Sequence, residues 1–316
     1  MLTDRGGGIS QEAVSGFESV DELQSQGINV QDINKLKATG ICTILSVSQT
    51  TRRNLLKIKG LSEAKVEKLK EAAAKMLPPT FATAAEIGLR RECCVMITTG
   101  SKTVDAMLGG GIQTGSLTEV FGEYRDTQLP LEMGGGGGKV AWIDTEGTFR
   151  PERLNAICDR FGVDTTAATG NVICGRAYSS EQQHDMLFEL AQRFVEDRTF
   201  KLLVIDSVMN LFRSDFSGRG ELSERQQKLN AFLSRLAKMA EEFNIAVLMT
   251  NQVQADPGAT AIFAGPSAKP IGGHILAHAS ATRIQLRKGR GEERIAKLVD
   301  SPCQPDGEST YALRVG

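Results

Sequence analysis

The feature that most constrains the fold is an alternation of short apolar runs with amphipathic stretches in the C-terminal two thirds of the chain. Apolar runs of strand length occur at residues 117–121, 140–143, 202–205 and 245–250. Before the last run, residues 229–243 repeat large apolar side chains at helical intervals. This alternation predicts an α/β fold with a mostly parallel sheet and helices on both faces. Ligands of such sheets bind at the carboxyl ends of the strands.

The N-terminal quarter has a different pattern, from which we predict a separate all-α domain. Residues 1–15 are glycine-rich and polar without periodicity, which predicts a disordered lead. Over residues 16–77, apolar side chains recur at helical intervals. A proline pair then forces an extended backbone, so residues 78–86 are expected to form a linker. The sheet domain follows over residues 87–316.

Inside the predicted helical domain, residues 58–62 (IKGLS) have a helix-hairpin-helix pattern. Gly60 can make the tight turn, and Ser62 can cap the helix that follows. The backbone N–H groups of such a turn can hold a phosphate without reading base sequence. A plain helical hairpin used only for packing is an equal alternative.

Composition excludes several classes of protein. The chain carries 37 Lys and Arg against 38 Asp and Glu, so a nucleic-acid contact must use local patches rather than bulk positive charge. Its six cysteines show no metal-ligand spacing and follow no secretory segment, which predicts a reduced intracellular chain. Because no apolar run reaches about 18 residues, no membrane partner is expected.

Two predicted strands have carboxylates at or just past their ends. The run 202–205 is followed by Asp206, and the run 140–143 is followed closely by Glu146. Two acids at strand ends suit metal-assisted phosphoryl chemistry, in which one holds Mg²⁺ or its water and the other polarises a water. A plainer alternative for Asp206 is that it caps the next helix.

Residues 143–153 (IDTEGTFRPER) closely resemble a signature stretch of the eukaryotic RecA-like strand-exchange recombinases. Residues 254–259 and 274–278 look like the meiosis-specific branch of that family. The resemblance covers nearly the whole chain and includes residues 41–44, 51–53, 217–223, 250–253, 269–274 and 286–291.

The resemblance implies a RecA-like P-loop NTPase core preceded by a small helix-hairpin-helix domain. It implies an ATP-dependent recombinase that forms filaments on single-stranded DNA. Such an enzyme pairs that strand with homologous double-stranded DNA and exchanges strands, in meiotic recombination and double-strand-break repair. The expected partners are both forms of DNA, further copies of the chain, a related recombinase and mediator proteins. The expected location is the nucleus.

The resemblance also assigns nucleotide roles residue by residue. Glu146 matches the acid that activates the hydrolytic water, and Gln252 matches a γ-phosphate sensor just past a strand end. Asp206 matches the acid that holds Mg²⁺ through water. The other residues matched to ATP binding are Gly122, Glu123, Tyr124 and Arg125 in the phosphate loop, Arg153 on the adenine, His278 lining a shared site, and Asp300 and Pro305 in a cap over a neighbouring subunit's nucleotide.

ATP would therefore lie between protomers. A core histidine on a helix is the alternative for His278. Although His274 and His278 are four residues apart, as in helical metal sites, no third ligand is near in the sequence, so zinc is not expected.

Two segments resemble the family's DNA-binding loops. Residues 253–269, starting at Val253, are rich in Ala, Gly and Pro and suit a wedge between stacked bases. The residues that match the first loop are Arg213, Arg219 and Arg225. Solvated charges near a helix start are the alternative for Arg213 and Arg225.

A basic cluster near the C-terminus could guide a second DNA molecule, with an exposed β-turn as the equal alternative. Its members are Arg287, Lys288 and Arg290.

Residues 81–84 (FATA) look like the family's Phe-x-x-Ala polymerisation element. In that element the linker adds a strand to the next protomer and inserts Phe81 into a pocket, with Ala84 as the second defining residue. Such a head-to-tail contact does not close, which produces filaments.

The phosphate loop departs from the family pattern. Laid from Gly122, the pattern G-x-x-x-x-G-K-[ST] fails at Thr127, Gln128 and Leu129, where it needs Gly, Lys, and Ser or Thr. A second register that ends at Lys139 fails as well.

The missing loop would supply backbone N–H groups, a helix N-terminus and a lysine to the phosphates, and a hydroxyl to Mg²⁺. We therefore expect this chain to bind ATP poorly. A mis-predicted exon or a splice variant would explain the departure. The alternative function is that of an ATPase-deficient variant that binds DNA or recombinase filaments without turnover.

Overall fold

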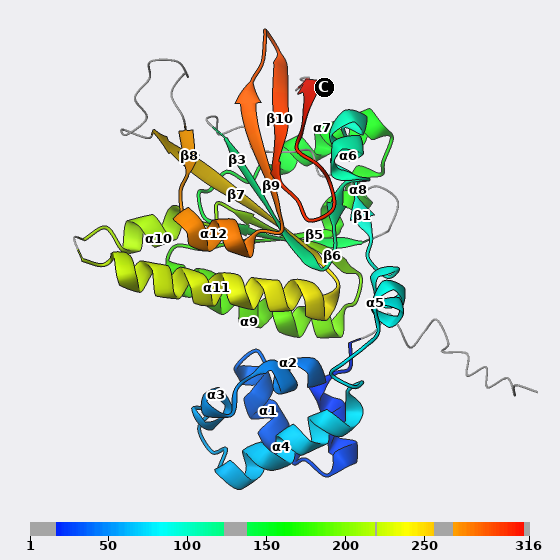
Figure 1. Cartoon of the computed structure of the whole chain (residues 1–316), viewed down its shortest axis with the longest axis vertical. Helices are drawn as coiled ribbons and strands as arrows, with labels where there is room; N and C mark the ends of the chain where they lie inside the picture. The colour runs from blue at the N-terminus through cyan, green and yellow to red at the C-terminus, as the bar shows by residue number, and fades with distance from the viewer. Residues whose placement is uncertain (1–16, 123–137, 219, 256–267, 313–316) are drawn as a thin grey trace, which may run out of the picture. The chain divides into compact units, whose positions relative to one another are not determined.

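The computed structural model, drawn in Figure 1, describes residues 17–122, 138–218, 220–255 and 268–312. The predicted disordered lead, residues 1–15, lies outside these ranges. The chain divides into two compact units, Met1–Val95 and Met96–Gly316.

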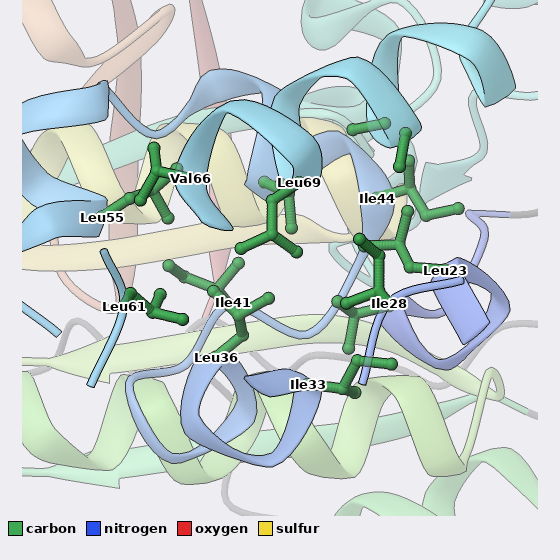
Figure 2. Packing of buried hydrophobic residues seen from close by; sticks show 14 residues of the cluster. Leu23, Ile28, Ile33, Leu36, Ile41, Ile44, Leu55, Leu61, Val66 and Leu69 are labelled. Atoms are coloured by element: carbon green, nitrogen blue, oxygen red, sulfur yellow. The ribbon is translucent and has the colours of Figure 1, made fainter. Parts of the chain in front are cut away.

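The described part of the first unit is helical. Its apolar side chains form one core, in which Leu23, Leu36, Ile44, Leu55 and Leu69 lie close together (Figure 2). The elements are a 3-10 helix, η2 (Val20–Gln26), and the α-helices α1 (Val30–Ala38), α2 (Ile44–Gln49), α3 (Arg52–Leu56), α4 (Glu63–Met76) and α5 (Ala84–Arg91).

The hairpin between α3 and α4 has the predicted glycine turn. Gly60 adopts a φ of +85°, a conformation that favours glycine, and its carbonyl accepts a hydrogen bond of 3.3 Å from Lys35 Nζ. Ser62 occupies the N-cap position of α4, but its side chain makes no capping hydrogen bond, so that detail of the prediction is wrong. Glu63 lies in the first turn instead, where its charge suits the helix dipole.

Helix α5 begins inside the segment that was expected to be a linker. Thr83 caps it: its Oγ1 accepts from the Glu86 N–H, and the Glu86 carboxylate accepts from the Thr83 N–H at 2.7 Å. This capping box is readable in the sequence as Thr-x-x-Glu, so α5 could have been predicted from it. The division between the units falls after Val95 rather than after residue 86.

The second unit is built on a sheet of nine described strands, in the order β11-β10-β9-β3-β7-β6-β4-β5, with β8 paired to β7. A two-stranded sheet, β1 (Met96–Ile97) and β2 (Ile112–Gln113), precedes it. The strands of the large sheet are β3 (Ser116–Gly122), β4 (Lys139–Asp144), β5 (Val172–Arg176), β6 (Phe200–Asp206), β7 (Ala246–Ala255), β8 (Ala268–Pro270), β9 (Thr282–Lys288), β10 (Glu293–Asp300) and β11 (Gly307–Ala312).

The prediction of a mostly parallel sheet is confirmed. Strands β9, β3, β7, β6, β4 and β5 pair in parallel, and four of them contain the four apolar runs found in the sequence. The antiparallel β9-β10-β11 meander was not predicted. Its strands alternate buried and exposed residues and carry several charges, so they lack the continuous apolar runs of buried parallel strands.

The long helix over residues 229–243 is also present, as part of α11. Helices α9, α10, α11 and α12 lie along one face of the large sheet (Figure 1). No described helix is both long and apolar enough to cross a bilayer. The helices of this unit are α6 (Lys102–Leu108), α7 (Pro151–Phe161), α8 (Thr165–Gly170), α9 (Ser180–Glu196), α10 (Asn210–Asp215), α11 (Leu222–Phe243) and α12 (Gly273–Ala279).

We predict that Lys70 stabilises the first unit by capping the C-terminus of α2. Its Nζ donates to the carbonyls of Val47 at 2.9 Å, of Ser48 at 2.7 Å and of Thr50. These carbonyls belong to the last turn of α2 and to its C-cap residue, Thr50, where a cation is favourable. Replacing Lys70 by Met should therefore lower the free energy of unfolding by about 1–2 kcal/mol.

The measurement is urea unfolding of the full chain, followed by circular dichroism. The matched control is Lys75→Met, an exposed position on the same helix. Equal stabilities of the Lys70→Met and Lys75→Met chains would show that the cap contributes nothing.

Candidate functional site

The carboxyl ends of three neighbouring strands form the candidate site. Asp144 ends β4 and Asp206 ends β6, and the two residues are direct partners in the parallel pairing. Glu146 lies in the turn after β4, and Gln252 lies on β7, the next strand along. The register of the sheet thus brings the predicted catalytic and metal-binding residues together at the carboxyl ends of these strands.

The turn that carries Glu146 is held by Asp144. Its buried carboxylate accepts hydrogen bonds from the four backbone N–H groups of residues 146–149, at 2.6 to 3.3 Å. Arg176, at the end of β5, pairs with the same carboxylate at 2.8 Å. Neither Asp144 nor Arg176 was predicted as a site residue, although an Asp that starts a turn is a known signal for such local bonds.

Glu146 and Gln252 are in direct contact. Gln252 Nε2 donates to Glu146 Oε1 at 2.6 Å, and Arg213 Nη1 donates to Gln252 Oε1 at 3.0 Å. The amide thus links the predicted catalytic acid to an exposed arginine of α10 that was assigned to DNA. The expectation that Gln252 lies just past a strand end is wrong, because pairing with β8 extends β7 to Ala255.

Asp206 is buried, with 8% of its surface exposed. This burial raises the pKa of Asp206 above its ordinary value, and the nearby charges of Glu146 and Asp144 act in the same direction. Two hydroxyls partly offset these effects: Thr250 donates to Oδ1 at 2.6 Å, and Thr148 donates to Oδ2 at 3.2 Å. Sequence reasoning missed both threonines, because only the folded register brings them to this carboxylate.

The residues around Asp206 fit a Mg²⁺ ion held through water. A buried carboxylate that resists ionisation gains from a nearby cation. Next to it, the buried Ser207 Oγ has no hydrogen-bond partner among the described residues and offers a second oxygen. Within the described ranges, no group of three or more His, Cys, Asp or Glu side chains is placed to hold a metal ion.

Gly122 ends β3 at the same edge, where it pairs with Gln252 on one side and with Leu286 on the other. A Cβ at this position would come within 2.6 Å of the Leu286 carbonyl oxygen, so a larger residue does not fit. Glu123, Tyr124 and Arg125 lie outside the described residues, as does the rest of the predicted phosphate loop.

The other predicted nucleotide residues are spread over the second unit. Arg153 is half-buried on α7. Asp300 pairs with Arg283 near the start of β9, whereas Gly122 aligns with Leu286 near the end of that strand. Asp300 lies on β10, four strands away from Asp206 on β6 in the order of the sheet. Pro305 follows it in the exposed connection to β11.

His278 lies in the last turn of α12 with an exposed side chain, so it is not a core histidine. The rings of His274 and His278 have centroids 6.4 Å apart.

The predicted DNA-binding residues lie on several elements. Val253 belongs to β7, and Arg225 is half-buried on α11. Arg219 and residues 256–267 of the second loop lie outside the described residues. In the basic cluster, Arg287 and Lys288 end β9 and Arg290 lies in the β9–β10 connection, and all three are exposed.

An acid offsets part of the charge of this basic cluster, because Arg287 pairs with Glu308 at 2.7 Å.

Both residues of the polymerisation element are exposed. Phe81 has 94% of its surface accessible and lies outside helices and strands. Ala84 is the first residue of α5.

The raised pKa of Asp206 predicts a pH-dependent gain of stability on substitution. A group whose pKa is raised by folding favours the fold when protonated, and that contribution is lost as the pH rises through the raised pKa. Asp206→Asn should therefore melt at a higher temperature than the parent at pH 8. The difference should shrink as the pH falls toward the ordinary value of 3.8.

Asp197→Asn is the control, for which we expect a change of melting temperature of the opposite sign. Hydrogen bonds from Lys139 and Thr199 lower the pKa of Asp197 to about 2, so this carboxylate stabilises the fold at neutral pH. We expect Asp197→Asn to melt below the parent at pH 8, with a difference that fades as the pH falls below about 4 toward the lowered pKa. Thermal melts of the three chains across pH measure both effects, and an Asp206→Asn chain that melts below the parent at pH 8 would contradict the first.

Comparison with known proteins shows the family to which the chain is similar. The family model named Rad51 matches residues 90–316. The human meiotic recombination protein DMC1/LIM15 homolog is 55% identical over 322 residues, which cover 98% of this chain and 95% of the human protein. The Candida albicans meiotic recombination protein DLH1 is 57% identical over 311 residues, covering 94% of this chain and 96% of that protein.

The Saccharomyces cerevisiae meiotic recombination protein DMC1 is 53% identical over 318 residues, which cover 96% of this chain and 95% of the yeast protein. The resemblance to the meiosis-specific recombinases, predicted from short motifs, extends over nearly the whole chain. The chain therefore belongs to the Rad51 family.

Proposed function

We propose that this chain acts in the nucleus as an ATP-dependent DNA recombinase of meiosis and double-strand-break repair. It would form filaments on single-stranded DNA and exchange that strand with a homologous duplex. The observation that carries the proposal is the contact of Gln252 with Glu146 beside Asp206, at the strand ends that adjoin Gly122. The names of its relatives, which are meiotic recombination proteins, support the same function.

The proposed chemistry divides among the residues at this edge. Glu146 is the general base that takes a proton from the attacking water. The turn held by Asp144 keeps its carboxylate in place. Asp206 would hold Mg²⁺ through water, with Ser207 Oγ nearby. When bound, the ion offsets negative charge on the phosphates.

The amide of Gln252 connects this chemistry to DNA. It occupies Glu146 Oε1, and its own oxygen is occupied by Arg213. A DNA phosphate that draws Arg213 toward itself would weaken this second bond, because the guanidinium would then move away from the Gln252 oxygen. DNA binding would therefore change the position of Gln252 and the freedom of Glu146.

Within the proposal, ATP lies between two protomers. Asp300 on β10 lies four strands away from Asp206 on β6, and Pro305 follows in the connection to β11, so they would not reach the nucleotide held at the acids of their own chain. Both are exposed, as is His278, and a neighbouring copy could use them to cover its partner's site.

We predict that this chain binds Mg·ATP weakly and that restoring the phosphate loop strengthens binding. Inserting Gly-Lys-Thr between Asp126 and Thr127 restores the spacing G-x-x-x-x-G-K-T from Gly122 and returns the lysine and hydroxyl that the pattern requires. Charged hydrogen bonds of this kind contribute on the order of 10- to 100-fold in affinity. Titration with a fluorescent ATP analogue in Mg²⁺ buffer measures the difference.

Insertion of Gly-Ala-Ala is the matched control, because it adds the same length without the lysine or hydroxyl. Tight binding by the unmodified chain, or equal binding by all three chains, would overturn the prediction.

A second function is favoured by the departure at residues 127–129. Without turnover, the chain would join or poison filaments of an intact relative through its polymerisation element and DNA loops. The two functions differ in a mixing experiment. An active chain would catalyse strand exchange alone, whereas a filament partner would change exchange only when an active recombinase is present.

The polymerisation element generates a further prediction. Phe81 is almost fully exposed, and the large sheet has two outer strands, β5 and β11, to which an extended segment could add. Phe81→Glu should therefore reduce self-association in sedimentation velocity. The control is Val30→Glu, which changes another exposed apolar side chain of the first unit. Unchanged assembly of Phe81→Glu, or equal losses in both variants, would argue against the element.

A further inference from the structure

A buried polar cluster joins strands β3, β7 and β9, next in sequence to Gln252 of the candidate site. Glu119 of β3 is completely buried, and its Oε2 accepts from Arg283 Nε of β9 at 2.7 Å. Its other oxygen, Oε1, accepts from Asn251 Nδ2 of β7 at 2.8 Å. The cluster thus links the strand that enters the phosphate loop to the strand that carries Gln252.

Asn251 makes a second contact that reaches across the chain. The same Nδ2 donates to the carbonyl of Ile271 at 2.7 Å, and the Ile271 N–H donates to the carbonyl of Gln252 at 3.0 Å. These bonds continue the β7–β8 ladder, in which Val253 pairs with Pro270. Ile271, which precedes α12, is therefore hydrogen-bonded to β7 through Asn251 and Gln252.

Neighbouring residues of a strand point to opposite faces of the sheet. Asn251 faces Glu119, and Gln252 on the other face contacts Glu146. Hydrogen bonds that hold the Asn251 side chain on one face also restrict the backbone of β7 at this point. That backbone sets the position of the Gln252 Cα, from which the Gln252 side chain extends on the other face.

Stability alone does not explain an asparagine at this position. The Glu119 carboxylate already has a charged partner in Arg283. Asn251 is buried, and its Oδ1 accepts no hydrogen bond from the described residues, which is a cost that folded proteins rarely retain without use. The two acceptors at Nδ2 require a donor, and neither Asp nor an apolar residue provides one.

We propose that Asn251 is a positioning residue, held by the Glu119–Arg283 pair, that aligns Gln252 with Glu146 and ties Ile271 to the end of β7. This inference rests on the proposed function, in which Gln252 and the segment from Val253 respond to nucleotide and DNA. It adds that their response depends on a buried support on the opposite face of β7.

The test compares Asn251→Asp with the parent. An aspartate keeps the shape but removes both donated bonds and sets a second carboxylate against Glu119. We expect hydrogen exchange to rise by roughly tenfold at residues 252–255 and at Ile271, with β6 unchanged. We also expect affinity for a fluorescein-labelled oligo-dT, measured by anisotropy without nucleotide, to fall by about threefold or more.

A double variant that swaps the two side-chain types tests whether the lost bond can be restored. In the double variant Asn251→Asp with Glu119→Gln, the amide and the carboxylate swap places, so a donated bond between the two positions is restored. The aspartate at position 251 still cannot donate to the Ile271 carbonyl, so we expect the double variant to recover exchange protection at residues 252–255 and part of the DNA affinity, without full recovery at Ile271. Asn171→Asp, a half-buried asparagine at the end of α8, is the matched control and should change neither.

Exchange that stays unchanged in Asn251→Asp, or that rises equally in β6, would overturn the inference, because the residue would then be inert or merely stabilising. Absence of rescue would also overturn it. If the parent chain fails to bind oligo-dT, the proposed function fails, and the exchange comparison still decides the positioning role.

Discussion

The parallel register of β3, β7, β6 and β4 is the constraint on which the candidate site depends. It places Gly122 beside Gln252 and Asp144 beside Asp206, although these residues come from distant parts of the sequence. With the strands in register, the short turn after β4 satisfies its backbone by donating the N–H groups of residues 146–149 to Asp144. Glu146 then points to Gln252 because of pairing and turn geometry together.

Carboxylates are buried at and next to the site, and burying a charged group costs free energy. Asp206 lies buried near two other acids, and Glu119 lies completely buried on β3. Hydroxyls of Thr148 and Thr250 support the first carboxylate, and Arg283 with Asn251 supports the second. A fold selected for stability alone would place apolar residues there. Charges kept under these conditions mark a place where the chain is expected to bind ions or move protons.

Local patterns in the sequence predicted the central elements of the second unit. Continuous apolar runs located the four central strands, and helical spacing located α11. The positions of Asp206 and Glu146 could be predicted as well, because an acid in the last position of a buried strand, or just past it, lies at the carboxyl end of that strand. Arg176, Thr148 and Thr250 were missed, since each acts through a hydrogen bond that exists only after the strands pair. Asp144 was missed although its bonds to the following turn are local.

Gln252 was placed beyond the strand because the β7–β8 pairing cannot be read from spacing. Helix α5 was missed although its Thr-x-x-Glu signal was readable, because the neighbouring prolines dominated the interpretation. The most direct test of the account is phosphate release from ATP by the chain with a restored phosphate loop, with and without Glu146→Gln. The account predicts release that single-stranded DNA stimulates and that Glu146→Gln abolishes while nucleotide binding persists. Equal release by the two chains would contradict it.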